Sequence, residues 1–317
     1  MISENQRFKI LITGGGGYIG SILTPTLLEK GHEVTVVDNF MFNQGAFLDC
    51  IGHKKLTVIR GDARNEELVK KYTKGVDFIL PLAALVGAPL CDRDPIAAKT
   101  TNLEAVKMLL ILRDKGQKII YPTTNSGYGI GQEGVHCDEN TPLNPITLYG
   151  RTKVEAEKLI LEAGNSITLR LATVFGISPR MRLDLLVNDF TYRAVYDRFL
   201  VVFESHFKRN YIHVRDIAKA FSHCIDNFDK MKSEPYNVGL SDANLSKWEL
   251  CEKIKEQVPG FIFVESKVGE DPDKRNYIIS NEKIEKTGFK PDISLEEGIA
   301  ELVKGYQIIK RTEFSNT

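Results

Sequence analysis

A glycine-rich turn near the start of the chain is the feature that most constrains its fold. Residues 8–12 form a short apolar run typical of a buried strand, and Gly14, Gly17 and Gly20 follow at three-residue spacing before a helical pattern begins. This order brings backbone N–H groups and the positive end of a helix to one place, which suits a dinucleotide pyrophosphate. We expect Gly14 to permit the tight turn, Gly17 to let the backbone approach the phosphates, and Gly20 to allow close helix–strand packing.

Strand and helix patterns alternate through the first half of the chain. The predicted strands are residues 8–12, 33–37, 56–60, 76–80, 118–121 and 168–171, and the predicted helices include 20–30 and 96–115, the second opening with Asp94 and Pro95. This predicts a doubly wound parallel α/β sheet of the Rossmann type, with ligands at the carboxyl ends of the strands. The alternation stops near residue 171. We therefore expect a nucleotide-binding domain of residues 1–170 and 211–233, and a smaller discontinuous α/β lobe of residues 171–210 and 234–317.

Composition argues against several classes of function. The 317 residues have a formal net charge of +0, which gives no reason to expect nucleic-acid binding. No run approaches the roughly 18 apolar residues of a membrane span, and the first residues lack the apolar core of a signal peptide. The five cysteines are scattered and form no CxxC pair, so we expect no disulfide framework, no metal centre and a cytoplasmic location.

The second predicted strand ends at Asp38, a residue that identifies the dinucleotide. A carboxylate there can accept both hydroxyls of the adenosine ribose and repels a 2′-phosphate, so NAD is favoured over NADP. Asp62, after the third strand, either bonds the adenine amine or caps the helix predicted at residues 66–72. The predicted cofactor-binding residues are Gly14, Gly17, Tyr18, Ile19, Gly20, Asp38, Asn39, Asp62, Ala63, Leu82, Ala83, Ala84 and Lys153.

Tyr149 and Lys153 are the candidate catalytic pair. They lie at the start of a predicted helix, and the i,i+4 spacing puts both side chains on one face. Thr124 ends the preceding strand and can hydrogen-bond the same substrate oxygen as Tyr149. A phenol needs a pKa shift of about 3 units, or about 4 kcal/mol, to ionise near neutral pH. The Lys153 ammonium and an oxidised nicotinamide are the charges expected to supply it, so that Tyr149 accepts an alcohol proton while Lys153 also holds the nicotinamide ribose.

A second tyrosine–lysine pair with the same spacing occurs at Tyr306 and Lys310. It belongs to a C-terminal amphipathic pattern, with no glycine loop or polar strand end nearby. We expect this second pair to be structural.

Together these motifs resemble the nucleotide-sugar epimerase/dehydratase branch of the extended short-chain dehydrogenases/reductases, over nearly the whole chain. Residues 209–216 are similar to a signature of that branch whose arginine contacts the nucleotide diphosphate, and residues 273–277 resemble a second such element. The resemblance thus implies a nucleotide-diphosphate sugar as substrate, with Arg209 and Arg275 on its diphosphate. It also implies a homodimer formed through the helix that carries Tyr149 and the apolar helix before it.

The chain departs from this branch at several substrate positions. Asn125 and Ser126 stand where 4,6-dehydratases carry an acid and a base, and a serine hydroxyl is too weak a base to remove a C5 proton. Thr173 stands where this branch usually has an asparagine that contacts the diphosphate, and we expect Asn188 to take over that contact. The predicted substrate-binding residues are Thr124, Asn125, Ser126, Thr173, Asn188, Arg209 and Arg275. Oxidation at sugar C4 remains, with a 4-epimerase and a non-catalytic NAD-binding sensor as alternatives.

Overall fold

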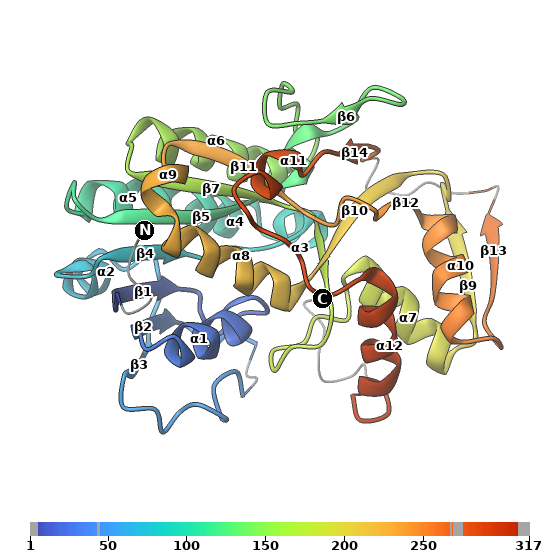
Figure 1. Ribbon diagram of the computed structural model, residues 1–317, viewed down its shortest axis with the longest axis horizontal. Coiled ribbons are helices and arrows are strands. Elements are labelled where there is room, and N and C mark those ends of the chain that lie inside the picture. Colours follow the sequence, from blue (N-terminus) through green and yellow to red (C-terminus); the bar gives the residue numbers. More distant parts are fainter. Residues whose placement is uncertain (1–5, 43–44, 267, 269–274, 310–317) are drawn as a thin grey trace.

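A seven-stranded parallel sheet occupies the left side of the molecule as Figure 1 shows it. The computed structural model describes residues 6–42, 45–266, 268 and 275–309. The strand order is β11-β7-β5-β4-β1-β2-β3. These strands are β1 (Lys9–Thr13), β2 (Glu33–Asp38), β3 (Leu56–Arg60), β4 (Phe78–Pro81), β5 (Lys118–Thr124), β7 (Ser166–Leu171) and β11 (Glu234–Val238). The predicted doubly wound parallel α/β fold is confirmed, and all six predicted strands belong to the sheet.

The edge strand β11 was not predicted. It pairs in parallel with β7, with Tyr236 opposite Leu169. Its residues follow position 233, where we placed the end of the nucleotide-binding domain, so the sheet extends beyond that boundary. The remaining division into two lobes stays a prediction.

Helices cover both faces of the sheet, because the strands are apolar on both sides (Figure 1). Ile10 and Ile12 of β1 share a core with helices α1 (Gly20–Glu29), α8 (Val214–Asp226) and α9 (Phe228–Met231). Leu11, from the same strand, shares the opposite core with α2 (Glu66–Thr73), α5 (Ala105–Leu112) and α6 (Leu148–Glu162). Among the residues described, no helix is long and apolar enough to cross a membrane.

The helix predicted at residues 96–115 consists of three consecutive segments. It comprises α4 (Pro95–Lys99), the π-helical turn η1 (Thr100–Glu104) and α5. Asp94 caps its start as predicted, since its side chain accepts a hydrogen bond from Ala97 N at 2.9 Å. The π turn brings the buried Asn102 to Leu85, whose backbone N–H and C=O both bond the Asn102 amide, at 2.8 and 2.9 Å. This tie holds the loop after β4 against the helix.

Small sheets and helices build the rest of the molecule. Strands β8 (Thr173–Phe175), β10 (Lys208–His213) and β12 (Asn244–Ser246) form one sheet, β9 (Phe199–Phe203) pairs with β13 (Ile262–Ser266), and β6 (His136–Cys137) pairs with β14 (Ile278–Ile279). The helical segments are α3 (Ala88–Arg93), the 3₁₀ turn η2 (Asn125–Tyr128), α7 (Leu186–Tyr196), α10 (Lys247–Gln257), α11 (Glu282–Glu285) and α12 (Leu295–Gly305). Helices α7, α10 and α12 pack around a separate apolar core that contains Phe190, Leu250 and Leu302.

Candidate active site

A cavity of about 470 Å³ lies at the carboxyl ends of the central strands. Its walls come from the loops after β1, β2 and β4, from the end of β5 and from α6. Residues of the second half, among them Thr173, Arg182 and Arg275, complete the walls. This is the place where ligands bind in open parallel sheets. All the residues predicted to bind the cofactor line this cavity: Gly14, Gly17, Tyr18, Ile19, Gly20, Asp38, Asn39, Asp62, Ala63, Leu82, Ala83, Ala84 and Lys153.

The glycine loop fits a dinucleotide pyrophosphate. Gly14 has a φ of +75°, and a Cβ there would overlap the backbone of Ala83, so only glycine suits this turn. A Cβ on Gly17 would meet little but Gly14 O, at 3.3 Å, and would instead occupy the cavity that the backbone leaves open. Our reason for Gly20 was wrong, because its Cβ would overlap Gly15 O in the loop itself rather than a neighbouring strand.

Asp38 is held in place by the backbone. One carboxylate oxygen accepts from Gly16 N at 2.8 Å and the other from Phe40 N at 2.6 Å. Burial raises the pKa of Asp38, whereas these two bonds and the charge of Arg180 lower it. Each oxygen has a further lone pair for a ribose hydroxyl, so the residue fits the predicted role.

Asp62 does not cap a helix. The N-cap of α2 is Asn65, whose side chain accepts from Leu68 N at 3.0 Å, so that alternative is wrong. Asp62 instead forms an ion pair with Arg64 at 2.6 Å, and this hydrogen-bonded cation lowers the pKa of its carboxyl. Both residues line the cavity, where Asp62 is available to an adenine amine.

Helix α6 presents the catalytic pair to the cavity. It begins after Thr147, whose side chain accepts from Gly150 N at 3.1 Å, so Tyr149 lies in the first turn. Burial raises the pKa of Tyr149 to about 12, while the cations Arg182 and Arg275 and a hydrogen bond with Thr124 lower it. The phenol is therefore neutral near pH 7 in the protein alone, and its ionisation depends on positive charge nearby.

The Lys153 ammonium faces the cavity from within the protein. The side chain is 3% exposed, and its Nζ lies 3.9 Å from the centroid of the Tyr121 ring. Burial lowers the pKa of Lys153 to about 7. Lys153 makes no hydrogen bond within the part of the chain that the structure describes, which leaves its N–H groups available to a ligand in the cavity.

A chain of polar contacts connects the end of β5 with Arg275. Thr124 Oγ1 donates to Ser126 Oγ at 2.9 Å, and Arg275 donates to the same Ser126 oxygen. All three residues line the cavity beside Tyr149. Arg275 therefore lies at the catalytic end of the cavity, close enough to influence the Tyr149 phenol electrostatically.

Three predicted substrate residues do not reach the cavity. Asn125 is 1% exposed and points into the protein, where neither amide atom has a partner among the described residues. Asn188 accepts from Gly176 N at 3.0 Å and donates to Arg182 O at 2.8 Å, so its amide supports the cavity wall from behind. Arg209 is 2% exposed and lies 5.7 Å from the Tyr277 ring centroid. In this structure the three side chains lie inside the protein, and a substrate role for them stays a prediction.

The other predicted positions divide as follows. Thr124, Ser126, Thr173 and Arg275 line the cavity as expected of substrate-binding residues. The Tyr306 hydroxyl is buried and donates to Asn188 O at 2.8 Å, which agrees with a structural role. Lys310, its expected partner, lies outside the described residues, as do Asp273 and Lys274 of the element around Arg275.

Two arginines of the cavity were missed by the sequence analysis. Arg182 forms an ion pair with Asp184, with contacts of 2.5 and 3.2 Å, and lowers the pKa of Tyr149. Arg180 is 1% exposed and lies over the Phe42 ring at 3.8 Å. In the sequence they appear only as two arginines after Pro179, in a segment without helical or strand periodicity. Without periodicity the sequence does not predict which way their side chains point.

Comparisons with known proteins agree with this geometry. UDP-glucuronic acid decarboxylase 1 of Xenopus tropicalis is 29% identical over 94% of this chain and 72% of its own length. The low-salt glycan biosynthesis protein Agl12 of Haloferax volcanii is 29% identical over 94% of this chain and 98% of its own. The crystal structure of UDP-glucuronic acid 4-epimerase from Bacillus cereus, in complex with UDP-glucuronic acid and NAD, has a TM-score of 0.83 at 22% identity. It covers 94% of this chain and 99% of the other.

The profile of one protein family spans most of the sequence. Residues 10–239 match the NAD dependent epimerase/dehydratase family, a range that contains the glycine loop, Asp38, Thr124, Tyr149 and Lys153. These residues also fit the cofactor by geometry, since the loop leaves room for a pyrophosphate and Asp38 keeps a lone pair on each oxygen. The chain therefore belongs to the NAD dependent epimerase/dehydratase family, and its cofactor is NAD.

Proposed function

We propose that this protein oxidises the C4 hydroxyl of a nucleotide sugar to a ketone with NAD as the oxidant. The observation that carries the proposal is the position of Tyr149, Thr124 and Lys153 in one cavity with the glycine loop. A phenol that can accept a proton, a hydroxyl that can orient an alcohol and an ammonium with free donors meet where the cofactor binds. This combination suits the removal of a proton from an alcohol.

Each residue has a defined part in this step. Tyr149 accepts the proton of the sugar hydroxyl, and Thr124 hydrogen-bonds that oxygen and holds it toward the phenol. NAD, when bound, accepts the hydride that leaves the sugar carbon. Arg182 and Arg275 stabilise the phenolate, since both lower the pKa of Tyr149. Lys153, whose N–H groups have no partner among the described residues, can donate to the cofactor ribose.

Within the described part of the site, the position of the dehydratase base that acts at C5 holds no carboxylate. Ser126 occupies the position where a dehydratase needs one, and its oxygen already accepts from Thr124 and Arg275. A serine hydroxyl held in this way cannot remove a carbon-bound proton. We therefore infer that the 4-keto sugar leaves without loss of water.

We infer further that the sugar is a GDP-linked heptose or hexose, and that the product enters a surface polysaccharide. Residues 82–91 resemble those of bacterial surface-polysaccharide enzymes, and the chain as a whole resembles the GDP-D-glycero-D-manno-heptose 4-dehydrogenase of capsule heptose synthesis. The relative Agl12 is named for glycan biosynthesis, which supports a role of this protein in making a polysaccharide.

A 4-epimerase is the second candidate. It would use Tyr149, Thr124 and Lys153 in the same way and return the hydride to the opposite face of the ketone. The favouring observation is the fold, because a UDP-glucuronic acid 4-epimerase is among the similar solved structures. A sensor that binds NAD without turnover is less consistent with the intact catalytic residues.

One assay separates these readings. The protein is incubated with NAD and a panel of GDP-, UDP- and dTDP-sugars, and NADH absorbance and product mass are followed together. We expect a GDP-sugar to give net NADH and a product lighter by two hydrogens. An isomer formed without net NADH would establish the epimerase instead. Binding of NAD with no conversion of any sugar would contradict both enzymatic readings.

A further inference from the structure

The Lys153 ammonium lies on an aromatic ring inside the protein. Tyr121, from β5, is 1% exposed, and its ring centroid is 3.9 Å from Lys153 Nζ. The negative face of an aromatic ring attracts a cation, and more strongly where water is excluded. The Tyr121 hydroxyl has no hydrogen-bond partner among the described residues, so the ring face is its evident contribution to the site.

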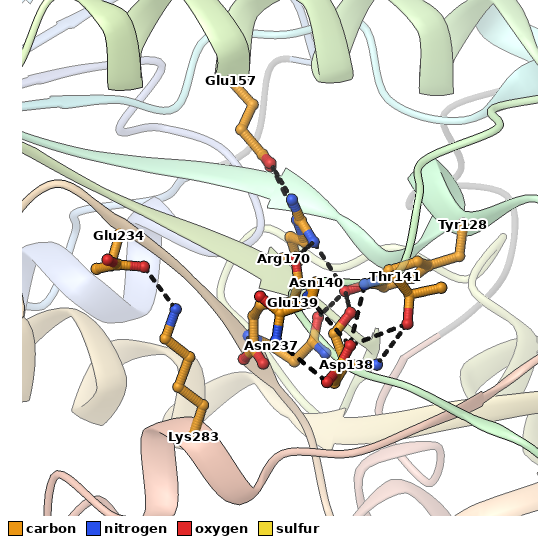
Figure 2. A network of polar contacts seen from close by, with 10 residues as sticks. All are labelled: Tyr128, Asp138, Glu139, Asn140, Thr141, Glu157, Arg170, Glu234, Asn237 and Lys283. Atoms are coloured by element: carbon orange, nitrogen blue, oxygen red, sulfur yellow. Dashed lines mark hydrogen bonds and ion pairs between the residues drawn. The ribbon is translucent and has the colours of Figure 1, made fainter.

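A buried carboxylate follows Lys153 one helical turn later. Glu157 is 3% exposed, and its i,i+4 spacing from Lys153 on α6 puts the two side chains on one face. Its Oε1 accepts two bonds from Arg170, at 2.9 and 2.7 Å (Figure 2). Its Oε2 is buried and has no hydrogen-bond partner in the described part of the chain. A carboxylate anchored by Arg170 therefore lies one helical turn along α6 from Lys153.

Arg170 prevents this carboxylate from turning away. Its guanidinium also donates to the Tyr128 hydroxyl at 2.9 Å and to the backbone oxygen of Glu139 at 3.1 Å (Figure 2). These bonds connect Glu157 on α6, through Arg170 on β7, with the turn after β5 and the loop before α6. A buried charge pair with this many bonds is rigid, and breaking it would leave an uncompensated charge.

We propose that Tyr121 and Glu157 are the positioning residues of Lys153: they favour its protonated form and direct it at the cavity. The ring lies against the ammonium, and the carboxylate supplies the opposite charge one turn along the helix. The role that this gives Lys153 in catalysis rests on the proposed function, but the contacts themselves do not.

The groups around Lys153 raise or lower its pKa according to their charge and burial. Burial lowers the pKa of Lys153, and Glu157 and the Cys91 sulfur of α3 act against it. Burial raises the pKa of Cys91 to about 11, so its thiol is neutral at physiological pH. Tyr149 on α6 and Tyr121 are also neutral there, since burial raises both phenol pKa values. Glu157 is then the one carboxylate identified as acting on Lys153 among the described residues.

The first experiment titrates Lys153 directly by NMR. Protein labelled with ¹³C at the lysine ε-carbon is followed from pH 5 to pH 10, and the Lys153 signal is assigned by its absence in K153M. In E157Q we expect the Lys153 pKa to fall by about one unit, because Glu157 opposes the lowering of that pKa by burial. Y128F is the matched control: it removes another contact of Arg170 and should leave the Lys153 pKa unchanged.

The second experiment tests the ring by itself. Y121F keeps the aromatic face and should titrate as the parent does, whereas Y121L removes the face and should lower the Lys153 pKa. The proposal is overturned if the Lys153 pKa in folded E157Q and in folded Y121L equals that of the parent. E157Q changes α6 and Y121L changes β5. If one of these variants does not fold, the Lys153 pKa in the other decides the proposal.

Turnover then separates this proposal from the proposed function. Where a sugar substrate is converted, the pH profile of kcat in E157Q should lose activity at a lower pH than the parent, whereas Y128F should follow the parent profile. If no sugar is converted, the proposed function fails while the NMR titration still decides the role of Tyr121 and Glu157.

Discussion

Tyr149 is a base only if neighbouring positive charge outweighs its burial. Burial raises the pKa of this phenol, which stays at about 12 even with Arg182 and Arg275 lowering it, far from the pH at which a cell works. Arg182 lowers that pKa most strongly among its neighbours, with Arg275 next among the cations. Both arginines come from the second half of the chain, so the catalytic residue of one half depends on charge from the other.

Replacing Arg182 should therefore change the pH dependence of turnover. Loss of its charge raises the Tyr149 pKa, and because the base form is required, the acidic limb of the kcat/KM profile should move to higher pH. We expect R182Q to shift that limb by about 0.5–1 unit. The measurement is the initial rate across pH 5 to pH 10 with an accepted sugar nucleotide.

Arg193 provides a matched control. It pairs with Asp189 at 2.9 Å on α7 and does not line the cavity, so R193Q removes a similar charge pair from the same lobe. Its acidic limb should coincide with that of the parent. An R182Q limb that also coincides would show that Arg182 does not tune Tyr149.

Sequence reasoning located the residues of the site whose chemistry depends on local spacing. Tyr149 and Lys153 follow from the helix period, and Gly14 and Asp38 from the strand–turn–helix order. It did not anticipate that the side chains of Asn188 and Arg209 bond the protein's own backbone, because a polar residue near a motif can do this as readily as bind a ligand. Only the fold decides between the ligand and the interior.

At the scale of elements, the helices follow clear local signals. Asp94 caps the helix that starts at Pro95, where its side chain accepts from Ala97 N. Thr147 caps α6, where its side chain accepts from Gly150 N. The π turn η1 has no such signal. It depends on the bond between Asn102 and Leu85, which are distant in sequence, so it could not be predicted from local pattern.

The homodimer stays a prediction that can be tested at helices α4 and α5. Ile96 and Ile111 on the α4–α5 helix are 77% and 83% exposed, which leaves apolar surface for a partner. We expect the protein to sediment at twice the 35.7 kDa mass of the chain, and I111E to shift it to the monomer. I308E alters an equally exposed isoleucine after α12 and should remain dimeric. A parent that sediments as a monomer would contradict this prediction.

On the scale of the whole molecule, the nucleotide-binding sheet and the smaller elements share one cavity. The Tyr18 hydroxyl of the glycine loop donates to Gly176 O at 2.6 Å, which ties the cofactor loop to the segment that carries Arg180 and Arg182. The alternation of strands and helices predicted the sheet, since both faces of each strand are apolar. The irregular second half has no period, so its contribution to the cavity emerged only from the fold.

The most direct test of the account concerns Tyr149 as the base. Y149F removes the proton acceptor and leaves the ring in place, so NAD binding should be retained while turnover of an accepted sugar nucleotide falls by about 10²–10⁴-fold. Y196F is the control, because the Tyr196 hydroxyl bonds Tyr306 O and neither residue lines the cavity, so its loss should not affect turnover. Single-turnover NADH formation measures both. Conversion by Y149F at the parent rate would contradict the central claim.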